Sequence, residues 1–201
     1  MRVYEEDPGA VRELAVDRRS FVIRTGDDLR EVAGYRGDGS SLSRRGLAVP
    51  DARLLANIVR PDAACVVLDP FAGVGGIVIE LERSGATVLS ADVDRTVAPG
   101  MARIANGCHL VASADALPLR ARTLDAVATE TPFDRSADRA VIGAMAEIFR
   151  CLRPGGRVAV MAPHRQAQAM KAVAERSGAR LAADEEVDRK GLAVRVLLWQ
   201  T

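Results

Sequence analysis

Residues 66–80 read VVLDPFAGVGGIVIE, an apolar run, an acid, a glycine-rich loop and a second apolar run. The first run is typical of a buried strand, and the second opens a segment with the length and pattern of a helix that ends at Gly85. Glycines directly after a strand allow a tight turn and let the backbone approach a ligand closely. The stretch therefore predicts a strand–loop–helix unit with a ligand site at the carboxyl end of the strand.

The same alternation continues along the chain. It predicts strands over 64–69, 86–92, 109–115, 124–130 and 157–163, and helices over 50–60, 75–85, 95–106, 136–152 and 166–178. A turn is expected at the RPGG that precedes residue 157, and the runs 185–190 and 192–200 are expected to form a closing hairpin. Strands that alternate with helices are typical of a mostly parallel sheet covered on both faces.

The first part of the chain is mixed in composition and dense in charge. It predicts a strand over 20–25, a helix over 27–35 that begins at Asp27, and a loop over 37–41. We expect an N-terminal extension, acting as a substrate lid, over 1–48 and one main domain over 49–201.

The bulk composition limits the classes of protein. The 201 residues are 48% hydrophobic, which excludes wholesale disorder, and 28 basic residues against 27 acidic ones give a formal charge of +1. That balance gives no support for a broad RNA-binding or membrane-binding surface. The cysteines are far apart, with no metal-ligand spacing, so no metal site is expected. The first residues lack a signal-peptide pattern, and we expect a cytoplasmic protein with no membrane contact.

Acids follow three consecutive predicted strands. The glycine loop lacks the third glycine of dinucleotide sites and the lysine of triphosphate sites, while Asp69 before it suits a cationic ligand such as S-adenosylmethionine (SAM). Asp92, with Asp94 as the alternative, can accept hydrogen bonds from ribose hydroxyls. Asp115 can accept one from an adenine amino group. Together these acids predict a SAM site.

These motifs resemble those of the class I SAM-dependent methyltransferases. VLDPFAGVGG is similar to the first motif of that superfamily, LSADVD to the second, and ASADALPL and TLDAVATETPF to the third and fourth. The resemblance implies an α/β, Rossmann-like fold with a seven-stranded, mostly parallel sheet and an antiparallel last strand. It implies SAM as the cofactor and a set of cofactor-binding residues: Asp69, Phe71, Gly73, Gly75, Gly76, Asp92, Asp94, Asp115 and Ala116.

Two segments resemble a narrower group. DPFAGVGG and the upstream SLSRRGLAVPDARLLANIV are similar to segments of RNA guanine-N2 methyltransferases that carry a THUMP domain. That group has Asp or Asn, two prolines and an aromatic residue after the fourth strand, where this sequence has Glu130, Thr131, Pro132 and Phe133. The resemblance makes these four the candidate catalytic residues: the acid and a proline carbonyl hold an amino group, and the ring stacks on the acceptor.

Three functions remain open. The altered fourth motif, the near-zero charge and the lack of a separate RNA-binding domain favour N-methylation of a small molecule with an amine, amidine, guanidine or nucleobase-like nitrogen. The alternatives are an RNA (tRNA or rRNA) guanine-N2 methyltransferase core, with RNA as the partner, and a non-catalytic SAM-binding partner subunit. Candidate substrate-binding residues are Arg45, Phe133 and His164. The sequence leaves O-methylation and the oligomeric state open.

Overall fold

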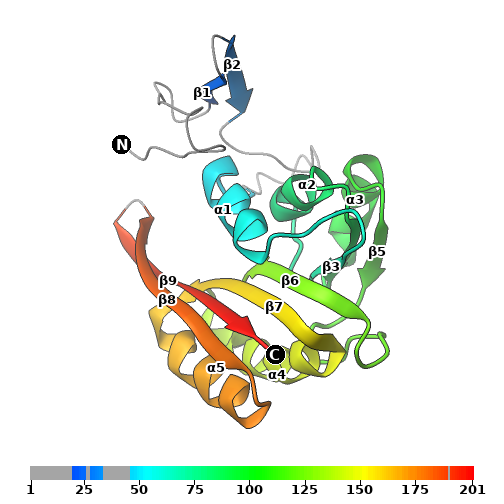
Figure 1. Ribbon diagram of the computed structural model, residues 1–201, viewed down its shortest axis with the longest axis vertical. Helices are drawn as coiled ribbons and strands as arrows, with labels where there is room; N and C mark the ends of the chain where they lie inside the picture. Colours follow the sequence, from blue (N-terminus) through cyan, green and yellow to red (C-terminus); the bar gives the residue numbers. More distant parts are fainter. Residues whose placement is uncertain (1–19, 26–27, 34–45, 190) are drawn as a thin grey trace.

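One seven-stranded sheet organises the part of the chain that the computed structural model describes, residues 20–25, 28–33, 46–189 and 191–201 (Figure 1). The strand order is β5-β4-β3-β6-β7-β9-β8. The neighbours from β5 to β7 pair in parallel, and β9 pairs antiparallel with both β7 and β8. The strands are β3 (Val66–Asp69), β4 (Thr87–Asp92), β5 (Cys108–Val111), β6 (Leu124–Glu130), β7 (Leu152–Pro163), β8 (Arg180–Arg189) and β9 (Leu192–Gln200).

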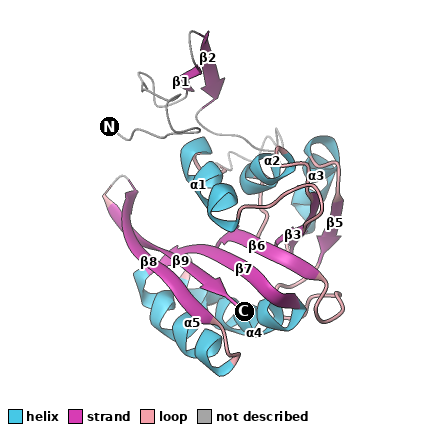
Figure 2. Cartoon of the chain, viewed as in Figure 1, coloured by secondary structure: helices cyan, strands magenta, loops and turns pink. Residues whose placement is uncertain are grey.

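Helices cover both faces of this sheet (Figure 2). One face carries α1 (Val49–Val59), α2 (Gly76–Glu82) and α3 (Ala98–Ile104), and the other carries α4 (Asp138–Cys151) and α5 (His164–Arg176). Short 3₁₀ turns, Arg95–Val97 and Arg135–Ala137, lead into α3 and α4. The predicted α/β fold, with a mostly parallel sheet and an antiparallel last strand, is confirmed.

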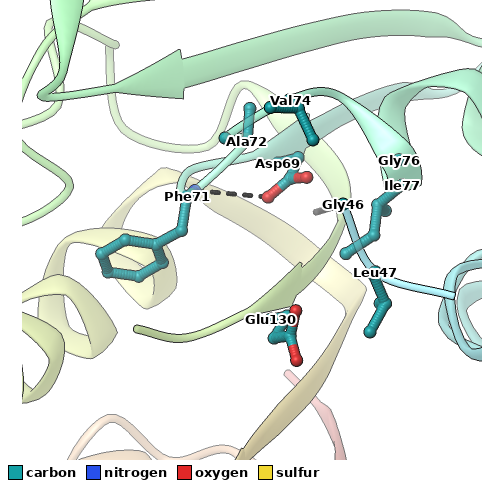
Figure 3. A pocket seen from close by; sticks show the side chains of 10 residues that line it. Gly46, Leu47, Asp69, Phe71, Ala72, Val74, Gly76, Ile77 and Glu130 are labelled. Atoms are coloured by element: carbon teal, nitrogen blue, oxygen red, sulfur yellow. Dashed lines mark hydrogen bonds between the residues drawn. The ribbon is translucent and has the colours of Figure 1, made fainter. Parts of the chain in front are cut away.

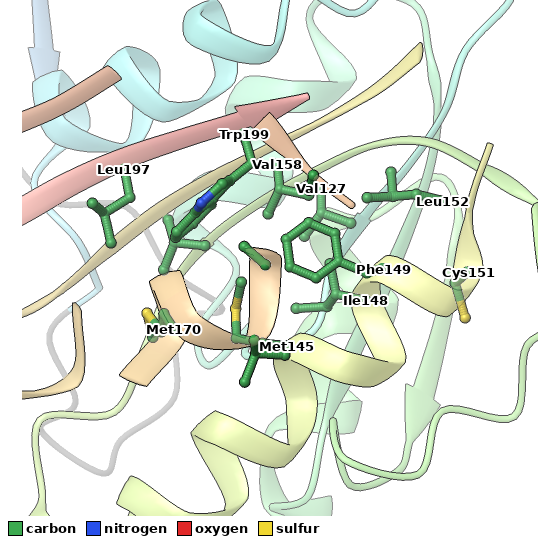
Figure 4. Close-up of a cluster of buried hydrophobic side chains, with 14 of the residues drawn as sticks. Val127, Met145, Ile148, Phe149, Cys151, Leu152, Val158, Met170, Leu197 and Trp199 are labelled. Carbon is green, nitrogen blue, oxygen red and sulfur yellow. The ribbon is translucent and has the colours of Figure 1, made fainter. Parts of the chain in front are cut away.

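Each face of the sheet has its own hydrophobic core because side chains alternate along a strand. On the α4–α5 face, Phe149 and Trp199 meet edge to face with ring centroids 6.2 Å apart, beside Met145 and Met170 (Figure 4). On the other face, helix residues such as Leu55 pack on the small side chains of the central strands. Burying one large apolar side chain contributes about 1.5–3 kcal/mol, so both cores hold the helices against the sheet.

The β8–β9 hairpin reaches beyond the sheet. The last β7–β9 pair is Pro163 with Val194, whereas the β8–β9 pairs continue to Arg189 and Leu192. Because β7 ends at Pro163, the tip of the hairpin lies past the carboxyl end of the parallel strands. The predicted closing hairpin is confirmed, and β8 is longer than expected.

The first described elements form a separate two-stranded sheet, in which β1 (Ser20–Thr25) pairs antiparallel with β2 (Asp28–Ala33). The predicted strand over 20–25 is confirmed, but the helix predicted over 27–35 is wrong. The backbone pairing of residues 28–33 with β1 outweighs the local helix signal. The expected loop at 37–41 lies outside the described residues, and the lid over 1–48 stays a prediction.

Two element boundaries also differ from expectation. β5 ends at Val111, so Asp115 lies in a turn after the strand instead of at its end. The backbone N–H of Ala112 still donates to the Asp92 carbonyl, after which Ser113 and Ala116 close a turn. β7 begins at Leu152 and includes the RPGG segment that the sequence predicts as a turn, because Leu152 already pairs with Leu124 of β6.

Candidate active site

A cavity of about 310 Å³ lies at the carboxyl end of β3. At β3 the order of the strands across the sheet reverses, because β4 pairs with one side of β3 and β6 with the other. Ligands of open α/β sheets bind at such a point. The lining residues are Gly46, Leu47, Asp69, Phe71, Ala72, Gly73, Val74, Gly76, Ile77 and Glu130 (Figure 3).

Gly73 and Gly75 are required to be glycine for different structural reasons. Gly73 has a φ of +50°, lines the cavity, and has nothing within 4 Å of the position that a Cβ would take. Gly75 has a φ of +81°, and a Cβ there would lie 2.3 Å from Ile104 Cδ1 and 2.9 Å from Met101 Sδ. Gly73 therefore leaves room for a ligand, whereas Gly75 lets the loop pack against α3. Gly76, the first residue of α2, also lines the cavity.

Asp69 is a buried acid on the cavity wall, 1% exposed. Its Oδ1 accepts hydrogen bonds from the Thr129 hydroxyl (2.7 Å) and from the Phe71 backbone N–H (3.2 Å). Burial raises the pKa of Asp69 to about 7, although these two donors oppose the rise. A cation in the cavity would favour the carboxylate form and would in turn be favoured by it.

Asp92 at the end of β4 is tied directly to the glycine loop. Its Oδ2 accepts from the Gly73 N–H and its Oδ1 from the Asp94 N–H, both at 2.8 Å. Asp94 instead accepts from the Thr96 N–H and hydroxyl, and so caps the 3₁₀ turn that follows. Of the two ribose candidates, Asp92 is the one that is oriented toward the loop.

Val93 was not among the sequence predictions. It lies between the two acids, and 74% of it is exposed, unusual for a large apolar residue. A flat apolar ligand such as an adenine would bury it. An apolar residue between two acids after a predicted strand was the signal in the sequence.

Asp115 and Ala116 lie in the turn after β5 and do not line the cavity. Asp115 accepts a hydrogen bond from the Ser113 hydroxyl. It lies against α4 at Gly143, where a Cβ would come within 3.0 Å of the Asp115 Cβ. The turn is thus held at the carboxyl side of the sheet, and its role in adenine binding stays a prediction.

Glu130 ends β6 and faces the cavity below Asp69 (Figure 3). Its carboxylate forms an ion pair with Arg189 at the tip of the β8–β9 hairpin. Burial raises the pKa of Glu130, while Arg189 acts to lower it. The Arg189 Nε lies 3.3 Å from Asp51 Oδ2, and its guanidinium carbon lies 5.7 Å from the centre of the Phe133 ring. Arg189 was not predicted from the sequence, because it comes from a hairpin far along the chain.

The loop after Glu130 is fastened to α5. Thr131 is 2% exposed; its hydroxyl donates to Gln166 Oε1 at 2.7 Å. Gln166 Nε2 donates to the Pro132 carbonyl at 3.0 Å, and Arg165 donates to the Phe133 carbonyl at 2.7 Å. These contacts fix the loop, and they mean that the Pro132 carbonyl already accepts one hydrogen bond. Gln166 and Arg165 were not predicted either.

Two other substrate-binding candidates are not among the residues that line the cavity in the described part of the chain. His164 is exposed at the start of α5, and Arg45 falls outside the described residues. Among the residues that the structure describes, no group of His, Cys, Asp and Glu could hold a metal ion. Within the same residues, no helix is both long and apolar enough to span a bilayer.

The cavity suits SAM by its chemistry. Asp69 offers a buried carboxylate to a cation, and Gly73 leaves open space above the loop. Asp92 has both oxygens fixed by backbone donors and keeps further lone pairs for hydroxyl donors. These residues, with the exposed Val93, would hold the amino-acid part, the ribose and the adenine.

Comparisons with known proteins agree with this geometry. Residues 68–160 match the family model described as a methyltransferase domain. The chain is 32% identical to a tRNA (guanine(10)-N2)-dimethyltransferase of Methanothermobacter thermautotrophicus, over 56% of this chain and 37% of that protein.

Solved structures share the fold. TrmN from Thermus thermophilus superposes with a TM-score of 0.65 and 22% identity, over 77% of this chain and 49% of that one. A 1,6-didemethyltoxoflavin-N1-methyltransferase from Burkholderia thailandensis, solved with 1,6-didemethyltoxoflavin and S-adenosylhomocysteine, has a TM-score of 0.56 and 20% identity, over 75% and 77%. The chain spans less than half the length of the tRNA dimethyltransferase and of TrmN. The motifs, the strand order and the domain matched over residues 68–160 make this chain similar to the class I SAM-dependent methyltransferases, among them the RNA guanine-N2 methyltransferases.

Proposed function

We propose that this chain transfers the methyl group of SAM to a nitrogen of a small molecule that carries an amine, amidine, guanidine or nucleobase-like group. The observation that supports it most is that Glu130 lines the same cavity as Asp69 and Gly73. A carboxylate that can accept an N–H therefore borders the space in which the cofactor fits. Phe133 follows three residues later and offers a ring for a planar acceptor.

The residues divide into two groups by role. Asp69, Gly73 and Asp92 would hold the cofactor, which supplies a methyl group on a sulfonium that is already a good leaving group. Glu130 would accept a hydrogen bond from the acceptor nitrogen, which would direct the lone pair of that nitrogen toward the cofactor in the cavity. Glu130 would also take up the proton that the nitrogen loses. Because the leaving group is good, holding the nitrogen in line supplies most of the acceleration.

The charges around the cavity favour a small acceptor over a nucleic acid. Asp69, Asp92 and Glu130 lie at adjacent strand ends, and Asp69 and Glu130 line the cavity itself. Carboxylates repel a phosphate backbone and attract a cationic or amine-bearing ligand.

The second candidate is an RNA guanine-N2 methyltransferase core. It is favoured by the 32% identity to the archaeal tRNA guanine-N2 dimethyltransferase and by the DPFAGVGG segment. In that case Glu130 and Phe133 would hold the exocyclic amino group and the ring of guanine in place of a free metabolite.

A transfer assay with methyl-labelled SAM separates these candidates. The protein is incubated with a cell extract divided into a small-molecule fraction and a protein-free RNA fraction. We expect label in the small-molecule fraction, lost in Glu130→Gln and retained in Glu186→Gln, an acid outside the cavity lining. Label in the RNA would establish the second candidate. Label in neither fraction, with SAM bound, would indicate the non-catalytic partner subunit.

A further inference from the structure

Arg189 joins three segments that are far apart in the sequence. It extends from the end of β8, contacts Asp51 in the first turn of α1, and pairs with Glu130 at the end of β6. Its guanidinium also lies 5.7 Å from the Phe133 ring centre, within the usual range of a cation–π contact. Arg189 thus contacts both residues that the proposed function assigns to the methyl acceptor.

The ion pair leaves Glu130 with a defined orientation. The Nη1 group of Arg189 donates to Oε1, and Glu130 also lines the cavity, where its remaining acceptor capacity can receive the N–H of the methyl acceptor. Asp51, which is 4% exposed, holds the guanidinium from the other side through Nε. Glutamate has one methylene more than the aspartate of the related motif, and a fixed partner removes the rotamer freedom that this adds.

We propose that Arg189 is the positioning residue of the acceptor site: it holds Glu130 as an oriented carboxylate and so makes the hairpin tip and the start of α1 part of that site. The inference rests on the proposed function, because Glu130 is the residue that would hold the acceptor nitrogen. Arg189 itself acts through Glu130.

The charges around Glu130 explain why a cation is needed there. The groups that face it are Arg189 from β8, Asp51 from α1 and Asp69 from β3. Burial and Asp51 favour the protonated form of Glu130, which would donate a hydrogen bond instead of accepting one. Arg189 is the group that opposes them.

The experiment measures the titration of Glu130 directly. Protein with ¹³C-carboxyl glutamate is titrated by NMR in the presence of S-adenosylhomocysteine, and the Glu130 signal is identified by its loss in Glu130→Gln. Arg189→Gln removes the charge, and Arg189→Lys restores it. Arg195→Gln is the matched control, because Arg195 lies on the same hairpin but pairs with Asp184 and Glu186.

We expect Arg189→Gln to raise the titration midpoint of Glu130 by about 1–3 pH units, the effect of losing a neighbouring opposite charge. The rising limb of methyl transfer against pH, measured with the labelled extract fraction, should move up by a similar amount. Arg189→Lys should reverse most of both shifts, and Arg195→Gln should cause neither.

An unchanged Glu130 midpoint in folded Arg189→Gln would overturn the proposal. If that variant showed only a lower melting temperature, Arg189 would have a purely structural role. Failure of the proposed function gives a different result. In that case the midpoint shifts, but Glu130→Gln transfers methyl groups at the wild-type rate or no fraction accepts label.

Discussion

Asp92 accepts a 2.8 Å hydrogen bond from the backbone N–H of Gly73, so the acid at the end of β4 orders the glycine loop after β3. The N–H of Asp94 fixes the second oxygen of the same carboxylate. Two fixed oxygens leave the carboxylate a single orientation. Any ligand above the loop therefore meets a preformed acceptor, with no side-chain entropy left to lose.

Asp92→Ala should weaken the binding of both SAM and S-adenosylhomocysteine. A hydrogen bond to a charged group contributes about 1.5–3 kcal/mol, which corresponds to about a tenfold to hundredfold loss of affinity. Asp94→Ala should cost less, since Asp94 caps a turn. Isothermal titration calorimetry measures both, and equal affinity in wild type and Asp92→Ala would rule out the ribose assignment.

SAM should bind more tightly as the pH rises through about 7. Burial raises the pKa of Asp69 to about 7, and a cationic ligand binds best to its ionised form. Binding should then release protons, which calorimetry in buffers of different ionisation enthalpy detects. Asp69→Asn should bind more weakly and lose this pH dependence. A dependence that survives in Asp69→Asn would assign the proton to another group.

The raised pKa of Asp69 also determines how the free energy of unfolding depends on pH. The folded protein keeps the Asp69 proton up to a pH of about 7, whereas the unfolded chain loses it near the ordinary value of 3.8. The contribution of Asp69 to the free energy of unfolding should therefore fall as the pH rises between these values. Urea unfolding of wild type and Asp69→Asn over this range tests it, and parallel curves would contradict it.

Gly73→Ala and Gly75→Ala should have different effects. At Gly75 a methyl group would overlap Ile104 and Met101, so the free energy of unfolding should fall by about 1–3 kcal/mol. At Gly73 the space is open, so a methyl group would add only the backbone strain of the positive φ, about 1 kcal/mol, and by filling the cavity it would also weaken SAM binding. Urea unfolding and calorimetry on both variants check this; the reverse pattern would assign the packing role to Gly73.

Glu130→Gln should lower the rate of methyl transfer by about 10²–10⁴, the range for a positioned acid–base group, with SAM affinity near wild type. The amide keeps the shape of the side chain and removes its charge. Single-turnover transfer on folded protein measures this step. A wild-type rate would remove Glu130 from the mechanism and leave His164 as the next residue to test.

Phe133→Ala should weaken acceptor binding by about 1–3 kcal/mol if the ring stacks on a planar group. The rate at saturating acceptor should change less than the Michaelis constant. The ring is also packed against the core on the α1 side, so the melting temperature of each variant is recorded as a control. A loss of stability with unchanged acceptor affinity would make Phe133 structural.

The central elements were predictable because their signals are local. The strand ending at Asp69, the glycine loop and the strand ending at Glu130 each depend on a short apolar run and its end. The helix expected at 27–35 failed because a hairpin partner supplies backbone hydrogen bonds that local propensity does not reveal. The strand expected over 109–115 ends earlier, at Val111, so Asp115 lies in the following turn. The sequence pattern alone does not show where backbone pairing with β4 stops.

Arg189 could not be predicted for a different reason. In the sequence it is one of many arginines, in a charged run near the end of β8. Only the register of β8 on β9, and of β9 on β7, carries it past Pro163 and next to Glu130. Contacts of this kind depend on sheet assembly as a whole. For the same reason Gln166 could not be connected to Thr131 from spacing alone.

The position of β9 between β7 and β8 has a consequence for the order of folding. β8 contacts the sheet through β9, so Arg189 can reach Glu130 only after β9 has docked along β7. The glycine loop and Asp92 need only β3, β4 and their neighbours, which are close in the chain and close their contacts early. We therefore expect the two halves of the site to form at different times during folding, the cofactor half first and the acceptor half when β9 docks along β7.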